Sequence, residues 1–156
     1  MWDPNTLKPE ERAKLVQEAV RLAEEHFDRD GFNCAESVLF GVATALKLPV
    51  DETVLRASTP FGGGIGRAGS VCGALSGGVM ALGLVLGRLT PDAEQRARAY
   101  ASAERLWRRF VEETGGEDCR QINTLGFGHP DHKAFCTRFV RIGAELAAEE
   151  LLCSGA

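Results

Sequence analysis

Four of the five cysteines are the residues of this sequence best suited to chemistry: Cys34, Cys72, Cys119 and Cys136. Four thiolates satisfy the ligand requirement of a tetrahedral zinc site or of an iron–sulfur cluster. Two of them could instead cycle between a dithiol and a disulfide. The alternative is structural, because buried free cysteine is a common small core residue. Each chemical use requires the fold to bring the side chains together.

Local spacing selects none of these uses. No C-x-x-C pair is present, so neither a thioredoxin-like motif nor a zinc ribbon is predicted. No C-x-x-C-H is present, which excludes covalent attachment of a c-type haem. Four cysteines permit three disulfide pairings, and the sequence favours none of them. The fifth cysteine, Cys153, lies close to the C-terminus, and we treat it as incidental.

Two of the cysteines fall at expected helix starts. Asn33 is a good N-cap before Cys34, and Glu36 completes a capping box. Ser70 is the expected cap of the next apolar helix, which places Cys72 in its first turn. A helix N-terminus stabilises thiolates, so Cys72 is the candidate nucleophile, and Arg67 could add to the effect. The alternative is that Cys72 fills a tight contact on a smooth face, since glycine recurs every fourth residue at positions 69, 73 and 77.

Histidine could assist one of the cysteines. His132 and Cys136 are four residues apart on the expected last helix, so they share a face. This spacing suits a pair of metal ligands, or a histidine that holds a proton for a thiolate. The alternative for His132, and for His129 upstream, is a solvated helix start. His26 lies among acidic residues and is expected at the surface.

A glycine-rich segment precedes Cys72 and contains a literal G-x-G-x-x-G at Gly64, Gly66 and Gly69. Dinucleotide binding requires this motif inside a βαβ unit, and no strand is predicted on either side of it. We therefore do not expect a nucleotide here. A glycine-rich turn that enters a helix still presents free N–H groups to an anion, and a thiolate is such an anion.

The elements that must position these residues are helices. Apolar periodicity and capping residues predict them over about residues 9–29, 34–46, 51–60, 70–86, 91–114 and 131–152, with Pro91 at a first helical position. Residues 117–130 are expected to be a loop with at most one helical turn at Cys119. No alternation typical of a strand is found. The prediction is an all-α fold, a compact single-domain bundle of about five to six helices over residues 1–156, around the Gly-rich helix 70–86.

Composition restricts the partners. The chain has 156 residues, 44% of them hydrophobic and 26% charged, which is typical of a globular protein. Its net charge is -4 without a basic stripe, so nucleic acid is not an expected partner. No basic and apolar leader is found at the N-terminus, and cysteine use then favours the reducing cytoplasm.

One uncharged segment has the length of a membrane span. Residues 68–87 carry no charge, but six of the twenty are glycine, and no Trp or Tyr stands at either end. We expect a buried central helix rather than membrane insertion. Its smooth glycine face could also form the seam of a homodimer.

The order of the four cysteines, with residues 72–77 reading C-G-A-L-S-G, resembles the C_GCAxxG_C_C family of redox-active proteins. Residues 32–36 and the glycine-rich stretch before Cys72 are similar to that family too, and the likeness extends over about residues 13–146. The resemblance implies redox chemistry at Cys34, Cys72, Cys119 and Cys136. Some relatives are selenoproteins, and a related domain occurs in split-Soret cytochromes, where an iron–sulfur centre has been proposed.

Three functions follow as expectations. The first is a metal or iron–sulfur protein in which the four cysteines bind zinc or a cluster, with electron transfer to an unidentified redox partner if iron is bound. The second is a metal-free thiol/disulfide oxidoreductase in which Cys72 attacks and Cys34, Cys119 or Cys136 resolves. The third is a non-catalytic helical module for packing or dimerisation. Whether the chain is an enzyme stays open between them.

Overall fold

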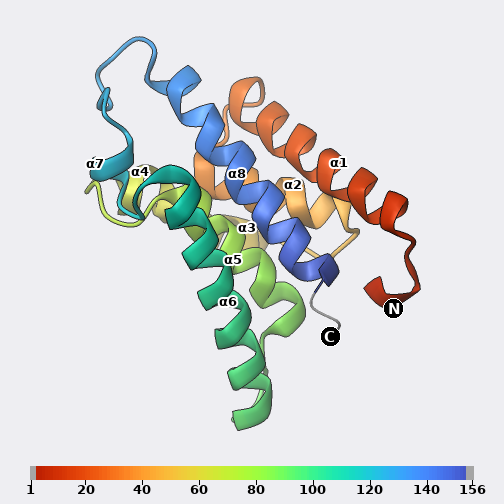
Figure 1. Ribbon diagram of the computed structural model, residues 1–156. Coiled ribbons are helices and arrows are strands. Elements are labelled where there is room, and N and C mark those ends of the chain that lie inside the picture. The colour runs from red at the N-terminus through yellow and green to blue at the C-terminus, as the bar shows by residue number, and fades with distance from the viewer. Residues whose placement is uncertain (1–2, 154–156) are drawn as a thin grey trace.

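The computed structural model describes residues 3–153 and is helical nearly throughout (Figure 1). No β-strand is present among these residues, and the all-α prediction is confirmed. The expected domain limits, 1–156, reach beyond the described residues at both ends and stay a prediction. The elements are the 3₁₀ turn η1 (Pro4–Thr6), α1 (Pro9–Asp28), α2 (Cys34–Ala45), α3 (Glu52–Ser58), the 3₁₀ turn η2 (Thr59–Phe61), α4 (Gly62–Ile65), α5 (Gly73–Leu86), α6 (Ala93–Thr114), α7 (Cys119–Ile122) and α8 (His132–Cys153).

The predicted capping box starts α2. The Asn33 side chain accepts from the backbone N–H of Glu36 at 3.0 Å, and the Glu36 carboxylate accepts from the backbone N–H of Asn33 at 2.8 Å. The Asp51 side chain caps α3 by accepting from the backbone N–H of Val54 at 2.9 Å. Gly31 and Gly115 follow α1 and α6 with φ of 82° and 86°, a conformation that glycine adopts without strain.

Two helix starts differ from the prediction. The helix α5 begins at Gly73 with Cys72 as its N-cap, rather than at Ser70, because residues 70–72 are held extended against residues 117–119. The helix α6 begins at Ala93, because the Asp92 side chain accepts from the backbone N–H of Gln95 at 2.9 Å. Pro91 therefore lies before the cap and not inside the helix.

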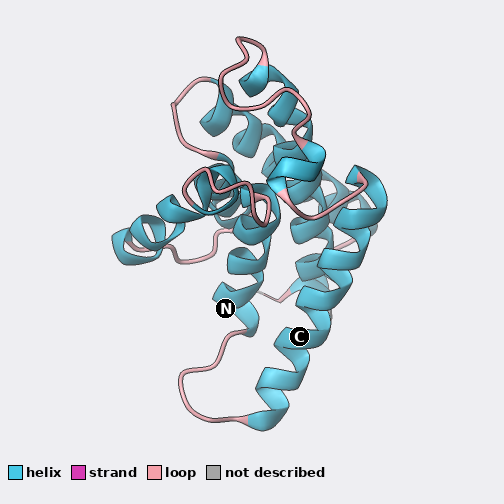
Figure 2. Ribbon diagram, turned by 90° about the vertical axis from the view of Figure 1, so that its left-hand side faces the viewer, coloured by secondary structure: helices cyan, strands magenta, loops and turns pink. Residues whose placement is uncertain are grey.

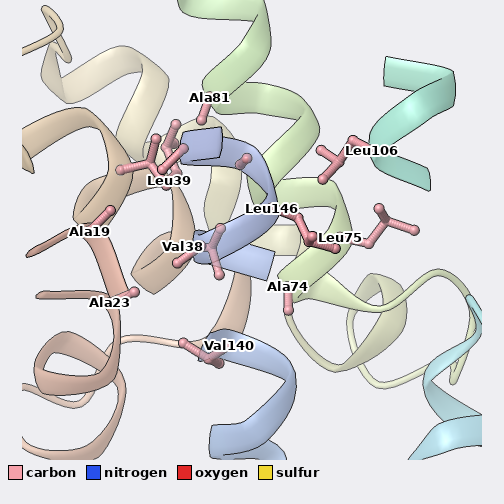
Figure 3. Packing of buried hydrophobic residues seen from close by; sticks show 14 of the residues in the cluster. Ala19, Ala23, Val38, Leu39, Ala74, Leu75, Ala81, Leu106, Val140 and Leu146 are labelled. Atoms are coloured by element: carbon pink, nitrogen blue, oxygen red, sulfur yellow. The ribbon is translucent and has the colours of Figure 1, made fainter. Parts of the chain in front are cut away.

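The long helices share one apolar core. The helix α8 packs against α1, α2, α5 and α6, and the Gly-rich α5 lies inside the bundle between α2, α6 and α8. In Figure 3, the side chains of Leu106 from α6 and Leu146 from α8 lie next to α5, and Val38 of α2 lies beside α8. These three side chains are almost completely buried.

Glycine allows the central helices to approach closely. A Cβ at Gly41 of α2 would lie 2.5 Å from the backbone N of Ala23 in α1, and a Cβ at Gly143 of α8 would lie 2.6 Å from the carbonyl O of Ala74 in α5. These two contacts fix how closely α2 packs on α1 and α8 packs on α5. In Figure 2 the junction between α5 and α6 extends away from the rest of the bundle.

The uncharged stretch at residues 68–87 does not form a membrane span. It contributes the short α5 and the extended residues before it. Within residues 3–153, no helix is both long and apolar enough to cross a bilayer.

Candidate functional site

The four predicted cysteines line one pocket with a volume of about 410 Å³. They come from four elements: Cys34 is the first residue of α2, Cys72 is the N-cap of α5, Cys119 is the first residue of α7, and Cys136 lies one turn into α8. Cys72 and Cys119 are buried, and Cys34 and Cys136 are half-buried. The fold therefore brings together residues that local spacing could not relate.

The first contact of the pocket is between α2 and α5. A Cβ at Gly73 would overlap the sulfur of Cys34, and a Cβ at Gly77 would overlap the carbonyl O of Ala35. Only glycine at positions 73 and 77 lets α5 lie this close to the start of α2. The C-G-A-L-S-G segment thus has a physical role, since its two glycines set Cys72 beside Cys34.

The second contact places Cys119. The backbone N–H of Cys72 donates to the carbonyl of Glu117 at 2.7 Å, and the backbone N–H of Cys119 donates to the carbonyl of Ser70 at 2.6 Å. A Cβ at Gly64 would lie 2.7 Å from the Cβ of Cys119. This small ladder is why residues 70–72 are extended, and it holds Cys119 on the wall of the pocket.

The glycine-rich loop forms the mouth of the pocket. Residues 63–67 all have positive φ, including the two non-glycine residues Ile65 at 63° and Arg67 at 67°. No strand precedes this loop in the described chain, so it is not part of the βαβ unit in which G-x-G-x-x-G binds a dinucleotide. The left-handed turn directs the chain back on itself, and Gly62, Gly63, Gly66 and Arg67 line the pocket.

The third part of the wall comes from α8 and the loop before it. The Nδ1 atom of His132 lies 3.9 Å from the Cys136 sulfur and 2.9 Å from the Asn123 side-chain nitrogen. The Phe127 ring packs edge-on against His132, with centroids 5.1 Å apart, and Arg67 lies 5.8 Å from the centroid of the same ring. His132 is therefore part of the pocket, and not the solvated helix start that was the alternative for it.

Burial raises the pKa of all four thiols. For Cys72 desolvation is the largest cause, and repulsion from Cys34 and Cys119 adds to it. Burial, with repulsion from the other cysteines, raises the pKa of Cys136 to about 12. Desolvation also raises the pKa of Cys34, against backbone hydrogen bonds from Gly63, Ala35 and Gly73 that lower it. Desolvation likewise raises the pKa of Cys119, although a hydrogen bond from the Asn123 side chain opposes the shift.

These directions correct one expectation. Cys72 was predicted to have its thiolate favoured by a helix N-terminus, but its pKa is raised, because burial and the neighbouring thiols outweigh the backbone hydrogen bonds from Ala74 and Leu75. A thiolate at Cys72 needs a further positive charge in the pocket.

Three other predicted positions lie outside the pocket. Cys153 is exposed at the end of α8, and the His129 side chain is 42% exposed. His26 was expected at the surface, and this is wrong. It packs against the rings of Phe32 and Phe40 with centroid distances of 5.9 and 5.1 Å, because α1 lies against α2, and its Nδ1 pairs with Asp30.

The donor set of the pocket contains sulfur, nitrogen and neutral oxygen. Within residues 3–153, no Asp or Glu lines it. No group of three or more His, Cys, Asp or Glu side chains in this part of the chain is gathered tightly enough to hold a single metal ion. Soft thiolate ligands without carboxylate are typical of zinc, copper(I) and iron–sulfur sites.

Sequence reasoning missed several lining residues: Asn33 as a pocket side chain, Thr59, Asn123 and Phe127. The first was assigned only a capping role. Asn123 ends the short α7, and Phe127 lies in the loop after it, where nothing in the local pattern distinguishes a pocket residue from a surface one. Their roles depend on contacts with α8 and the glycine-rich loop.

Comparison with known proteins identifies the family of the chain. Residues 32–150 match the model of a family described as "Putative redox-active protein (C_GCAxxG_C_C)". This chain belongs to the C_GCAxxG_C_C family. The matched range contains all four cysteines of the pocket and leaves out Cys153. The expected resemblance to this family is thereby confirmed.

A relative of this C_GCAxxG_C_C protein is found in Archaeoglobus fulgidus, where it is named an uncharacterized protein. It is 28% identical over 127 residues, which cover 76% of this chain and 84% of the relative. No solved structure matches the chain.

Proposed function

We propose that this C_GCAxxG_C_C protein binds an iron–sulfur cluster through Cys34, Cys72, Cys119 and Cys136 and transfers electrons. The observation that carries the proposal is the convergence of four cysteines, from four separate elements, on one pocket without a carboxylate. Four cysteine thiolates are the usual ligand set of [2Fe–2S] and [4Fe–4S] clusters.

The arrangement favours a cluster over a single ion. Zinc binds sulfur at about 2.3 Å, so four thiolates on one ion must nearly touch one another. The described side chains contain no group gathered in that way. A cluster of several iron and sulfide atoms is larger, and its four ligands stand around a volume rather than around a point. A pocket of about 410 Å³ lined by four cysteines fits such a group.

The protein supplies what a negatively charged centre requires. Backbone hydrogen bonds reach Cys34 from Gly63 and Gly73 and reach Cys72 from Ala74, and Arg67 lines the same pocket. Hydrogen bonds to the sulfurs and the degree of solvent exposure set the potential of an iron–sulfur centre. When bound, the cluster supplies one-electron transfer.

Iron bound in the pocket would change the protonation state of the thiols. Thiols such as Cys72 and Cys136, whose pKa is raised by burial and by repulsion from neighbouring cysteines, are poor nucleophiles by themselves. Iron ions would reverse this effect, because a coordinating thiol is deprotonated by the metal.

The dithiol oxidoreductase stays the second candidate, because Cys34 is the strongest repulsive neighbour of Cys72. The two sulfurs therefore lie near one another, and Cys34 is the first choice as the resolving cysteine. In that function Cys72 would attack, and the raised pKa of its thiol counts against this role.

Reduction under anaerobic conditions tests the proposal. Protein purified without oxygen should absorb in the visible region, and dithionite should bleach this absorbance reversibly and produce an electron paramagnetic resonance signal. A colourless protein that consumes dithiol and disulfide equivalents in pairs would instead establish the second candidate.

The prediction of a homodimer needs a separate measurement, the mass in solution, since Gly73 and Gly77 of the predicted seam contact α2 within this chain.

A further inference from the structure

Asn123 lies between two of the four cysteines. Its backbone N–H donates to the carbonyl of Cys119 at 2.8 Å, and its side-chain nitrogen lies 2.9 Å from Nδ1 of His132. The same Nδ1 atom lies 3.9 Å from the Cys136 sulfur. A chain of contacts therefore connects Cys119, at the start of α7, with Cys136 on α8.

The partners of the Asn123 side chain all lie on its nitrogen. The residue is 7% exposed, and its side-chain oxygen is buried without a hydrogen-bond partner within residues 3–153. An amide nitrogen has two N–H groups, and one of them is directed to His132. The other is available to the Cys119 sulfur, since a hydrogen bond from this side chain lowers the pKa of that thiol against the effect of burial. The contacts of the nitrogen therefore set how the amide is turned.

Ligation of Cys119 would favour the same orientation of the amide. The two ends of an asparagine amide can exchange places when the side chain turns over. A thiolate that binds a metal carries no proton, so it accepts hydrogen bonds and donates none. The amide oxygen would repel such a sulfur, whereas the amide N–H donates to it. The nitrogen then also faces Nδ1 of His132, which must accept, and the proton of the neutral ring must be on Nε2.

We infer that Asn123 is a positioning residue of the pocket, which donates one N–H to the Cys119 sulfur and the other to His132 Nδ1 and thereby raises the reduction potential of the centre. An N–H donor stabilises a ligating sulfur most in the reduced state, because that state is the more negative. His132 holds the amide in this orientation. The effect on the potential rests on the proposed function, whereas the two hydrogen bonds do not.

Nitrogen nuclear magnetic resonance on the metal-free, reduced full chain tests the hydrogen bonds without iron. In wild type the ring proton of His132 should be on Nε2. Asn123→Asp keeps the size of the side chain but replaces the donor by an acceptor, so Nδ1 of His132 should become protonated. A protonated Nδ1 in wild type, or an unprotonated Nδ1 in both proteins, would overturn the inference.

The matched control is Asn5→Asp. It makes the same chemical change at an exposed position in the N-terminal turn η1, which lies away from α7 in Figure 1. This variant should leave the ring proton of His132 on Nε2. Protonation of Nδ1 in Asn5→Asp as well would assign the change to charge in general and overturn the role of Asn123.

Redox titration of iron-loaded protein tests the effect on the centre. Asn123→Ala removes both N–H donors, so the ratio of reduced to oxidised centre at a fixed applied potential should fall by about threefold to tenfold. His132→Ala should shift the ratio less and in the same direction, and this second shift should be smaller when Asn123 is already alanine. An unchanged potential in Asn123→Ala, or equal effects of His132→Ala in both backgrounds, would overturn the inference.

The two proposals can fail separately. A wild type that never binds iron but has the expected His132 tautomers would keep the hydrogen bonds and remove the cluster. Iron and sulfide in a wild type whose Nδ1 is protonated would keep the cluster and remove the positioning role. If Asn123→Ala loses its iron, the tautomer in Asn123→Asp still decides the inference.

Discussion

Gly73 lies against the sulfur of Cys34 so closely that a Cβ at position 73 would overlap it. This single contact joins the start of α2 to the start of α5 and sets two cysteines side by side. It gives the C-G-A-x-x-G motif a physical explanation in packing. The same contact makes the cysteine pocket sensitive to one methyl group on α5.

Gly73→Ala should therefore damage the pocket. The added methyl group must displace Cys34 or separate α5 from α2, and overpacking of this kind costs about 1–3 kcal/mol of unfolding free energy. Iron content after anaerobic purification should fall by more than half, as measured by elemental analysis with chemical denaturation in parallel.

The control is on the same helix. A Cβ at Gly83 meets no atom within 4 Å, so Gly83→Ala should keep its iron and gain about 0.5–1 kcal/mol from the better helix propensity of alanine. Equal iron in Gly73→Ala and Gly83→Ala would show that the close approach of α5 and α2 does not matter to the site.

The cap of α2 gives a second prediction. Asn33→Ala removes a hydrogen bond to the Glu36 N–H and another to the Thr59 carbonyl, and should destabilise the protein by about 0.5–2 kcal/mol. Because Cys34 directly follows the cap, iron should also be lost faster to a chelator.

Asp51→Ala is the matched change for this cap. It removes the corresponding hydrogen bond at the start of α3, which carries no cysteine. We expect a comparable loss of stability with an unchanged rate of iron release. If both variants release iron at the same rate, the effect belongs to global stability and not to the position of Cys34.

Single cysteine substitutions give a third prediction. Each single serine substitution removes one ligand from the pocket, at Cys34, Cys72, Cys119 or Cys136. For the buried Cys72 and Cys119, bound iron and visible absorbance should fall by at least about tenfold. Cys153→Ser should change neither quantity, since Cys153 is exposed on the last turn of α8. A loss of iron in Cys153→Ser would be inconsistent with the site.

Alkaline pH should destabilise the metal-free reduced protein. The half-buried thiol of Cys136, whose pKa is about 12 in the folded chain, ionises in the unfolded chain near pH 8.5. The stability from the protonated thiols is complete below about pH 8.5 and is lost as pH rises toward 12. Thermal melting should therefore show a Tm that falls between pH 8 and pH 10, and by less in Cys136→Ser. A Tm independent of pH in this window would contradict the raised pKa values.

Much of the fold follows from local signals in the sequence. Each of these signals involves only a few neighbouring residues: the apolar stripe of α1, the Asn33–Glu36 capping box and the glycine after α6. The structure has helices at the positions that these signals predict. The start of α5 was displaced from Ser70 to Gly73 because residues 70–72 pair with residues 117–119, almost fifty positions later. Pairing over that distance leaves no local trace.

The site residues likewise divide into those that the sequence predicts and those that depend on contacts between distant parts of the chain. The four cysteines were predicted because few residue types have their chemistry, and because their order resembles a family. Asn123 and Phe127 were missed, since amide and aromatic side chains in loops are common and only their contacts with His132 give them a place in the pocket. The pKa of Cys72 was expected to be lowered by the helix start, because its burial among other thiols could not be seen from sequence.

The central claim is tested most directly by measuring iron and acid-labile sulfide in protein purified without oxygen. The measurement compares wild type with the variant that has serine at positions 34, 72, 119 and 136. We predict iron and sulfide in equal, stoichiometric amounts in wild type and neither in the variant. Zinc without sulfide, or a metal-free wild type whose thiols oxidise in pairs, would contradict the cluster.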